Sequence, residues 1–222
     1  MSLVYGDDFA DKTLFKTENF KGFYRLFYQS SDIVDAENLL LPAMKLTPSC
    51  YSNMFFGCSK LSKCPELPAT DIATGCYSFM FKGCSNLVSP PILPAMKLEK
   101  SCYTNMFDSC TSLTTAPELP ATDIATGCYT NMFIGCSKIT TAPELPAPIL
   151  VDYCYSSMFS NCTKLSYVKM LAVEINGTQT FMSWLSNVSS SGTLVLNSES
   201  TISLPNGTSG IPEGWTVETV TV

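Results

Sequence analysis

The sequence predicts an α/β solenoid made of coils of 26 residues, each with one short helix and one short parallel strand. Segments that begin at Cys50, Cys76, Cys102 and Cys128 share the pattern C-Y-x-x-M-F-x-x-C, and a fifth segment opens in the same way at Cys154 before it diverges. Self-similarity at a fixed period is typical of a solenoid. A single repeat cannot bury its apolar face alone, so neighbouring coils must cover it.

Apolar residues occupy equivalent positions in all five segments, and we expect each of them to stack on its equivalent one coil away. The columns are Cys50, Cys76, Cys102, Cys128 and Cys154; Tyr51, Tyr77, Tyr103, Tyr129 and Tyr155; Met54, Met80, Met106, Met132 and Met158; Phe55, Phe81, Phe107, Phe133 and Phe159; and Cys58, Cys84, Cys110, Cys136 and Cys162.

Within a coil, the spacing changes from a helical to an extended pattern. Cys102, Met106 and Phe107 stand at i, i+4 and i+5, which predicts the inward face of a short helix. The residue before the second cysteine is Gly or Asn in most copies, which suits a left-handed helix C-cap. The stretch from Leu113 to Leu119 then predicts a short strand, and Leu-Pro-Ala predicts a turn.

The two ends of the chain depart from the repeat. We expect an irregular lead-in over residues 1–22, an N-terminal capping repeat over 23–49, the solenoid over 50–165 and a C-terminal α/β cap over 166–222. Apolar residues at helical spacing predict one amphipathic helix in each cap. These residues are Phe20, Phe23, Tyr24 and Phe27 at the N-terminal end and Phe181, Trp184, Leu185 and Val188 at the C-terminal end.

The strands expected after the repeat lie at 167–175, 192–196, 201–204 and 215–222, where the residues alternate loosely. Two tryptophans, Trp184 and Trp215, belong to this part of the chain. We interpret both as cap core, with exposed sugar-stacking platforms as the alternative.

The C-Y-x-x-M-F-x-x-C-x-x-L and P-E-L-P-A runs resemble those of bacterial BspA-like leucine-rich-repeat surface proteins, as does the ending GIPEGWTV at 210–217. The segment GFYRLFYQSSDI at 22–33 resembles the first, degenerate repeat of such chains, and Ile92 departs from the pattern where other copies carry Glu. The resemblance implies leucine-rich-repeat-like coils, a bacterial cell-surface or secreted location, and binding to host or microbial surface proteins or matrix. Because no signal peptide stands at Met1, we expect a mature or trimmed form.

Composition excludes several classes of function. The net charge of −6 and the pI of about 4.6 argue against nucleic-acid binding and against a polybasic membrane contact. No apolar run is long enough to span a bilayer. With no histidine in the chain, a catalytic Ser-His-Asp or Cys-His arrangement is excluded. We therefore predict no enzyme, no cofactor and no metal.

The 11 cysteines allow two interpretations. On a helix, Cys50 and Cys58 would be too far apart to bridge, whereas equivalent cysteines in adjacent coils would be within reach of each other. Each column has five members, so disulfides would always leave one over. We favour free cysteines packed as small core residues, with disulfides or a metal as the alternative.

One set of exposed positions is a candidate binding face. If Leu113 and Leu119 face inward, the polar residues between them point to solvent, and stacking arrays them into an acidic, hydroxyl-rich strip. The same strip could equally serve only to keep the molecule soluble. Its residues are Glu66, Thr115, Glu118, Thr141 and Glu144.

We therefore expect an exported, non-catalytic module for cell-surface recognition or adhesion. The alternatives are a carbohydrate-binding surface component, which exposed aromatic residues would favour, and a structural spacer, which a featureless surface would favour.

Overall fold

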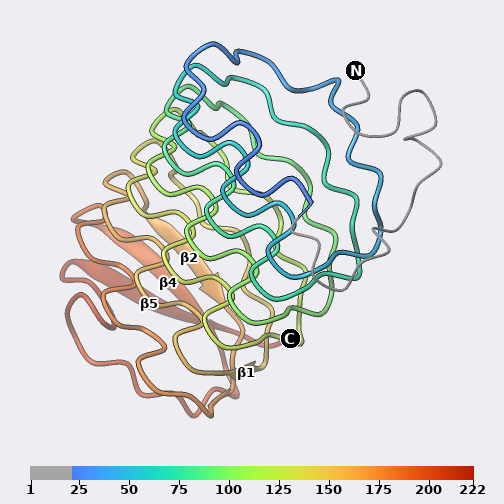
Figure 1. The fold of residues 1–222 in the computed structure, drawn as a ribbon. Coiled ribbons are helices and arrows are strands. Elements are labelled where there is room, and N and C mark those ends of the chain that lie inside the picture. The colour runs from blue at the N-terminus through green and yellow to red at the C-terminus, as the bar shows by residue number, and fades with distance from the viewer. Residues whose placement is uncertain (1–21) are drawn as a thin grey trace.

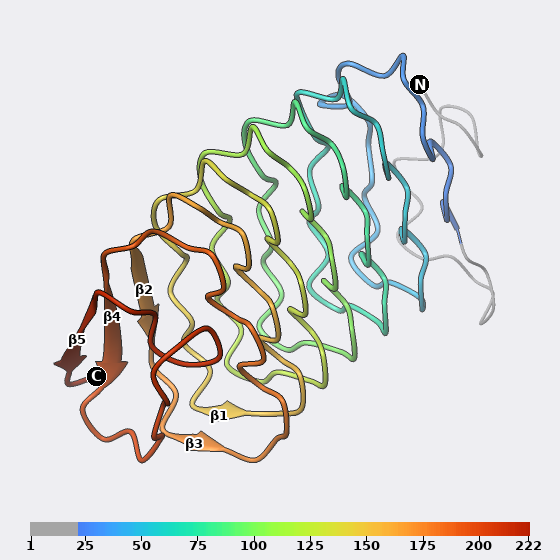
Figure 2. The same cartoon turned by 90° about the vertical axis from the view of Figure 1, so that its left-hand side faces the viewer.

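The computed structural model describes residues 22–222, and this part of the chain is a parallel β-solenoid without any helix. Successive coils stack side by side, and the two ends of the described chain lie at opposite ends of the stack (Figures 1 and 2). The predicted solenoid is confirmed, but the predicted α/β coil with a helix in each turn is wrong. Since residues 22–222 form no helix, none of them belongs to a helix that could span a bilayer.

Regular strands occur only in the C-terminal coils. β2 (Tyr167–Met170), β4 (Gly192–Asn197) and β5 (Trp215–Val220) form a three-stranded parallel sheet in that order. β1 (Ile149–Leu150) pairs in parallel with β3 (Glu174–Ile175). In earlier coils, isolated parallel bridges take the place of strands, and they join Asp35 to Lys63, Lys45 to Asp71 and Lys97 to Asp123.

The segments predicted as helices are instead stacks of turns, because only half of their N–H groups stay within the coil. The N–H groups of Tyr51, Asn53 and Phe55 donate to carbonyls of the next coil at 2.9–3.0 Å. The N–H groups between them, such as that of Met54, donate three residues back along the chain. An α-helix would need every N–H to donate four residues back. We call the stack formed by residues 49–58 and their equivalents in the other coils the turn ladder.

A left-handed residue recurs at every fourth position of the turn ladder. The φ angles of these residues lie between 50° and 76°. This four-residue period is close to the 3.6-residue period of a helix, so Cys102, Met106 and Phe107 share one side in either structure. The left-handed residues form three columns: Ser49, Gly75, Ser101, Gly127, Tyr153 and Gln179; Asn53, Phe79, Asn105, Asn131, Ser157 and Ser183; and Gly57, Gly83, Ser109, Gly135, Asn161 and Asn187.

The helices predicted for the two caps are also wrong, because both segments form turn ladder instead. Phe20 lies outside the described residues, and 22–29 contains left-handed residues at Arg25 and Gln29. At the other end, the N–H of Phe159 donates to the carbonyl of Trp184 at 3.0 Å, so 179–188 continues the ladder in register. Strands were correctly expected around β2, β3, β4 and β5, whereas 201–204 forms none.

The five predicted apolar columns are buried side by side. Tyr51 and Tyr77 stack with ring centroids 5.7 Å apart, and Phe55 and Phe81 stack at 5.6 Å. All 11 cysteines are free, and ten of them are buried. The second cysteine column has a further role, because each thiol donates to a backbone carbonyl of the preceding coil, as Cys84 does to Phe55 at 3.1 Å.

Burial raises the pKa of the core thiols above their ordinary value of 9.0, to about 11 for Cys50 and about 12 for Cys154. Burial also raises the pKa of the tyrosine column, as at Tyr103. The unfolded chain releases its thiol protons at lower pH than the folded chain does. The stability from these thiols is therefore complete below about pH 9 and falls as the pH rises.

We predict a steep loss of stability between pH 9 and 11, with each contributing thiol removing about 1.4 kcal/mol per pH unit. Guanidinium unfolding under reducing conditions, repeated at several pH values, measures this slope. Cys136→Ala should make the slope shallower by the share of one thiol. A free energy of unfolding that stays constant up to pH 11 would contradict the buried, protonated thiol columns.

A second prediction separates the turn ladder from a helix. Asn131 has a φ of 57°, which costs alanine about 1 kcal/mol but costs glycine nothing. Both substitutions remove the same contact, in which the Asn131 amide donates to the Asn105 side-chain oxygen at 3.4 Å. Asn131→Gly should therefore be more stable than Asn131→Ala by about 1 kcal/mol in urea unfolding. In a helix the order would be reversed, because alanine is the better helix former.

Candidate binding face

Proline shapes one side of the coils. Residues 64–70, 90–96, 116–122 and 142–148 carry prolines at equivalent positions, and we call these four stacked segments the proline face. Proline has no N–H to donate. Within the described chain, no backbone hydrogen bond joins any of these four segments to another. These four coils are held to one another elsewhere, mainly by the turn ladder, whereas 142–148 bonds to the coil that follows it through the N–H groups of Ala142 and Leu145.

Grooves open between the coils of the proline face. One of about 670 Å³ is walled by prolines of two coils and includes Glu66 and Ile92. Another of about 380 Å³ includes Glu118 and Glu144, between Pro117 and Pro120 on one coil and prolines of the next. A third, of about 620 Å³, extends from Glu66 toward the N-terminal coil.

The structure places all five predicted face residues at the surface but does not bring them all into one site. Glu66, Glu118 and Glu144 line the grooves. Thr115 and Thr141 are exposed but do not line them, and Thr141 forms a parallel bridge with Tyr167. Leu113 and Leu119, the predicted inward neighbours, are buried.

The charge on the proline face is balanced at its ends and not in its middle. At one end, Lys169 Nζ lies 2.7 Å from Glu144 Oε2, and this hydrogen bond raises the pKa of Lys169. At the other end, Lys63 Nζ lies 2.6 Å from Glu37 Oε2, which likewise raises the pKa of Lys63. Between residues 22 and 222, Glu66 and Glu118 take part in no ion pair.

Between these two free carboxylates lies Ile92, which is 80% exposed. Sequence reasoning noted Ile92 as a departure from the repeat but missed the grooves. The signal was present in the proline columns, which were interpreted only as turns.

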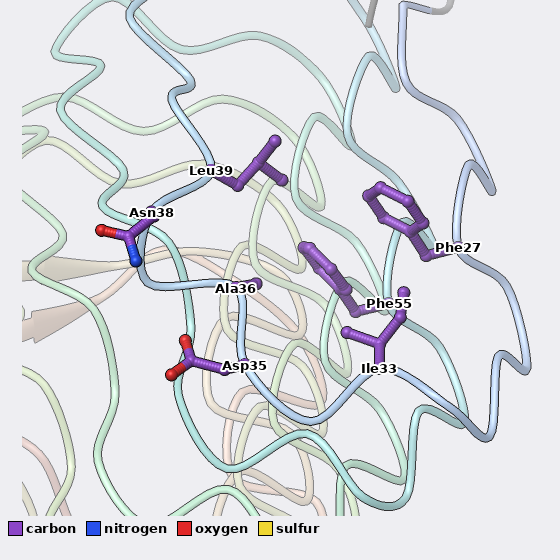
Figure 3. Close-up of a pocket in the computed structure, with 7 residues that line it drawn as sticks. All are labelled: Phe27, Ile33, Asp35, Ala36, Asn38, Leu39 and Phe55. Carbon is purple, nitrogen blue, oxygen red and sulfur yellow. The ribbon is translucent and has the colours of Figure 1, made fainter. Parts of the chain in front are cut away.

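Apart from these three grooves, a cavity of about 490 Å³ opens at the N-terminal end of the stack. Its wall is mostly apolar and includes the rings of Phe27 and Phe55 (Figure 3). Asp35 and Asn38 also line it, but their polar ends point away from these rings (Figure 3). Asp35 is instead 3.6 Å from Lys63 Nζ. This arrangement offers space but no converging reactive groups.

One charged pair breaks the repeat, on the turn ladder. Lys82 Nζ lies 2.7 Å from Asp108 Oδ2, in a column otherwise occupied by uncharged residues. The amide of Asn105 donates to the same oxygen at 2.8 Å, and the Ser109 hydroxyl donates to Asp108 Oδ1 at 2.7 Å. Each carboxylate oxygen is thus satisfied inside the cluster, which suits a structural role.

Over residues 22–222, no group of three or more histidine, cysteine or acidic residues is placed to hold a metal ion. Trp184 and Trp215 are buried, as the cap-core interpretation predicted. No protein-family model, no curated protein and no solved structure matches the chain.

We predict that Lys82→Met destabilises the protein by about 2 kcal/mol, because it leaves the largely buried Asp108 carboxylate without its cation. The double variant Lys82→Met/Asp108→Ile should recover most of this loss, since Ile134 already occupies the same column. Thermal and urea unfolding of both variants measure the difference. A double variant as unstable as the single one would show that the charge left behind is not the cause.

Proposed function

We propose that this chain is a non-catalytic recognition module that binds a protein partner along the proline face. The observation that carries the proposal is the row of proline-walled grooves in which carboxylates recur from coil to coil. Solenoids commonly bind partners along such extended, repeated surfaces. A partner that lies across several coils would meet similar chemistry at each step.

The sequence resemblance to BspA-like surface proteins supports an extracellular setting for this activity. On that basis we propose a bacterial cell-surface or secreted location, with a host or microbial surface protein or a matrix component as the partner. The proposal does not depend on a leucine-rich-repeat fold, since the coils contain turn ladder in place of helices.

A non-catalytic role is supported by the chemistry of the grooves. The groove carboxylates repeat with the coils, whereas an active site requires one particular arrangement of groups. The chain has no histidine to act as a general base, and the non-repeated pair of Lys82 and Asp108 is occupied by its own partners.

The two alternatives fit less well. Sugar recognition commonly uses exposed aromatic rings, but both tryptophans are buried, and Tyr24, Tyr153 and Tyr167 are only 39%, 38% and 37% exposed. A pure spacer would not need grooves or unpaired carboxylates in the middle of one face.

The experiment is a binding screen of the chain against matrix proteins, mucins and polysaccharides, run beside the triple variant Glu66→Ala/Glu118→Ala/Glu144→Ala. We expect protein binding that the triple variant loses. The control is Glu199→Ala/Glu213→Ala/Glu218→Ala, which removes three exposed carboxylates elsewhere on the surface. Polysaccharide binding that survives the triple variant would favour the glycan alternative, and no binding by folded protein would favour the spacer.

A further inference from the structure

Four successive coils of this solenoid alternate between two types. LPAMKL occurs at 41–46 and 93–98, and LPATDI occurs at 67–72 and 119–124, whereas the next coil reads LPAPIL at 145–150. The proline face and the segment 38–44 that precedes it therefore have a second period of two coils, which ends at Glu118. One column runs Leu40, Glu66, Ile92, Glu118, Glu144, and its neighbour runs Met44, Thr70, Met96, Thr122, Pro148.

Apolar and acidic rows therefore alternate at the surface. Leu40 and Ile92 are 63% and 80% exposed, and Met44 and Met96 are 43% and 56% exposed. The acidic row between them carries Glu66, and the next carries Glu118.

The column that follows Met44 and Met96 alternates between lysine and aspartate, and these residues form ion pairs between neighbouring coils. Lys45 lies 2.9 Å from Asp71, and Lys97 lies 3.3 Å from Asp123. These pairs leave the carboxylates of Glu66 and Glu118 as the uncompensated charges in the middle of the face, two coils apart.

The spacing of these two carboxylates indicates the kind of partner that fits. Equivalent rings of neighbouring coils lie 5.6 Å apart for Phe55 and Phe81 and 5.9 Å apart for Tyr77 and Tyr103, so equivalent positions two coils apart are separated by about 11 Å. An extended chain advances about 3.1–3.3 Å per residue, so side chains three residues apart are separated by about 10 Å, and the flexible stems of lysine or arginine cover the difference of about 1 Å. In a polyproline II segment those two side chains point to the same side.

We propose that the proline face binds an extended basic segment of a partner protein, with lysine or arginine three residues apart on Glu66 and Glu118. Apolar residues of the segment contact Ile92 between the two carboxylates. This inference rests on the proposed function and specifies the chemistry of its partner.

Charge and shape both support this occupant. The chain carries a net charge of −6, so a basic segment is attracted over a distance as well as at the face. The methylene stems of lysine and arginine pack well on apolar walls while their charged ends stay in water. The groove on the N-terminal side of Glu66 is lined mostly by proline and leucine. The groove on its other side is lined by prolines of two coils and by Lys63, whose charge is already paired with Glu37 and Asp35.

The test uses a fluorescent peptide of four Lys-Pro-Leu triplets and a control peptide of the same composition with its lysines contiguous. Anisotropy titrations at low ionic strength should show the triplet peptide binding about fivefold more tightly, since its cations reach both carboxylates. Glu66→Gln/Glu118→Gln should lose about the same factor. The charge-matched control Glu199→Gln/Glu213→Gln should lose none.

Ile92→Glu separates this site from general attraction to an acidic protein. Glutamate occupies the equivalent position of three other coils, so the coil accepts it. We expect Ile92→Glu to weaken binding of the triplet peptide, because the apolar contact is lost. General attraction would instead strengthen binding through the added charge.

Equal affinity for both peptides, equal losses in both Gln variants, tighter binding by Ile92→Glu, or no peptide binding would each overturn the inference. If matrix-protein binding still required Glu66, Glu118 and Glu144 in that case, the proposed function would stand and only the basic, extended partner would be wrong.

Discussion

The architecture depends on the hydrogen bonds that alternate N–H groups of the turn ladder donate to the next coil. The turn-ladder part of each coil thereby satisfies half of its N–H donors within the coil and half through the neighbouring coil. A coil cut out of the stack would lose those partners together with the cover of its apolar columns, so it is stable only within the array. The left-handed residue at every fourth position makes this alternation geometrically accessible, and glycine, asparagine and serine occupy most of those positions.

That constraint explains what could be predicted from the sequence. The columns of Cys, Tyr, Met and Phe identified a solenoid and its buried positions, because burial depends only on which side chains face inward. The prediction of a helix in each coil was wrong, because a turn period of four residues and a helix period of 3.6 residues both place Cys102, Met106 and Phe107 on the same side. The glycine or asparagine before the second cysteine was correctly expected to be left-handed, but it closes a turn and not a helix. Serine and phenylalanine at other left-handed positions, such as Ser101 and Phe79, concealed the rest of the pattern.

The candidate site was predicted in part for a similar reason. Exposure of Glu66, Glu118 and Glu144 follows from the alternation of apolar and polar residues around them. The grooves lie where no backbone hydrogen bond joins neighbouring coils, and the alternation of apolar and polar residues does not indicate which segments lack such bonds. Ion pairs between coils could not be predicted from the sequence either, because the pairing of Glu144 with Lys169 depends on the register of two coils.

The two sides of each coil thus contribute differently to holding the stack together. On the turn ladder, alternate N–H groups bind the next coil, and substitutions there change stability. On the proline face, the segments 64–70, 90–96 and 116–122 form no backbone hydrogen bonds with one another, so side chains such as those of Glu66 and Ile92 can vary without breaking such bonds. The alternation of the two coil types occurs on this second side and its flank, while the buried columns stay nearly invariant from coil to coil. The proposed binding of a partner requires a surface whose side chains can vary without breaking the bonds between coils, and the exposed positions of the proline face meet that requirement.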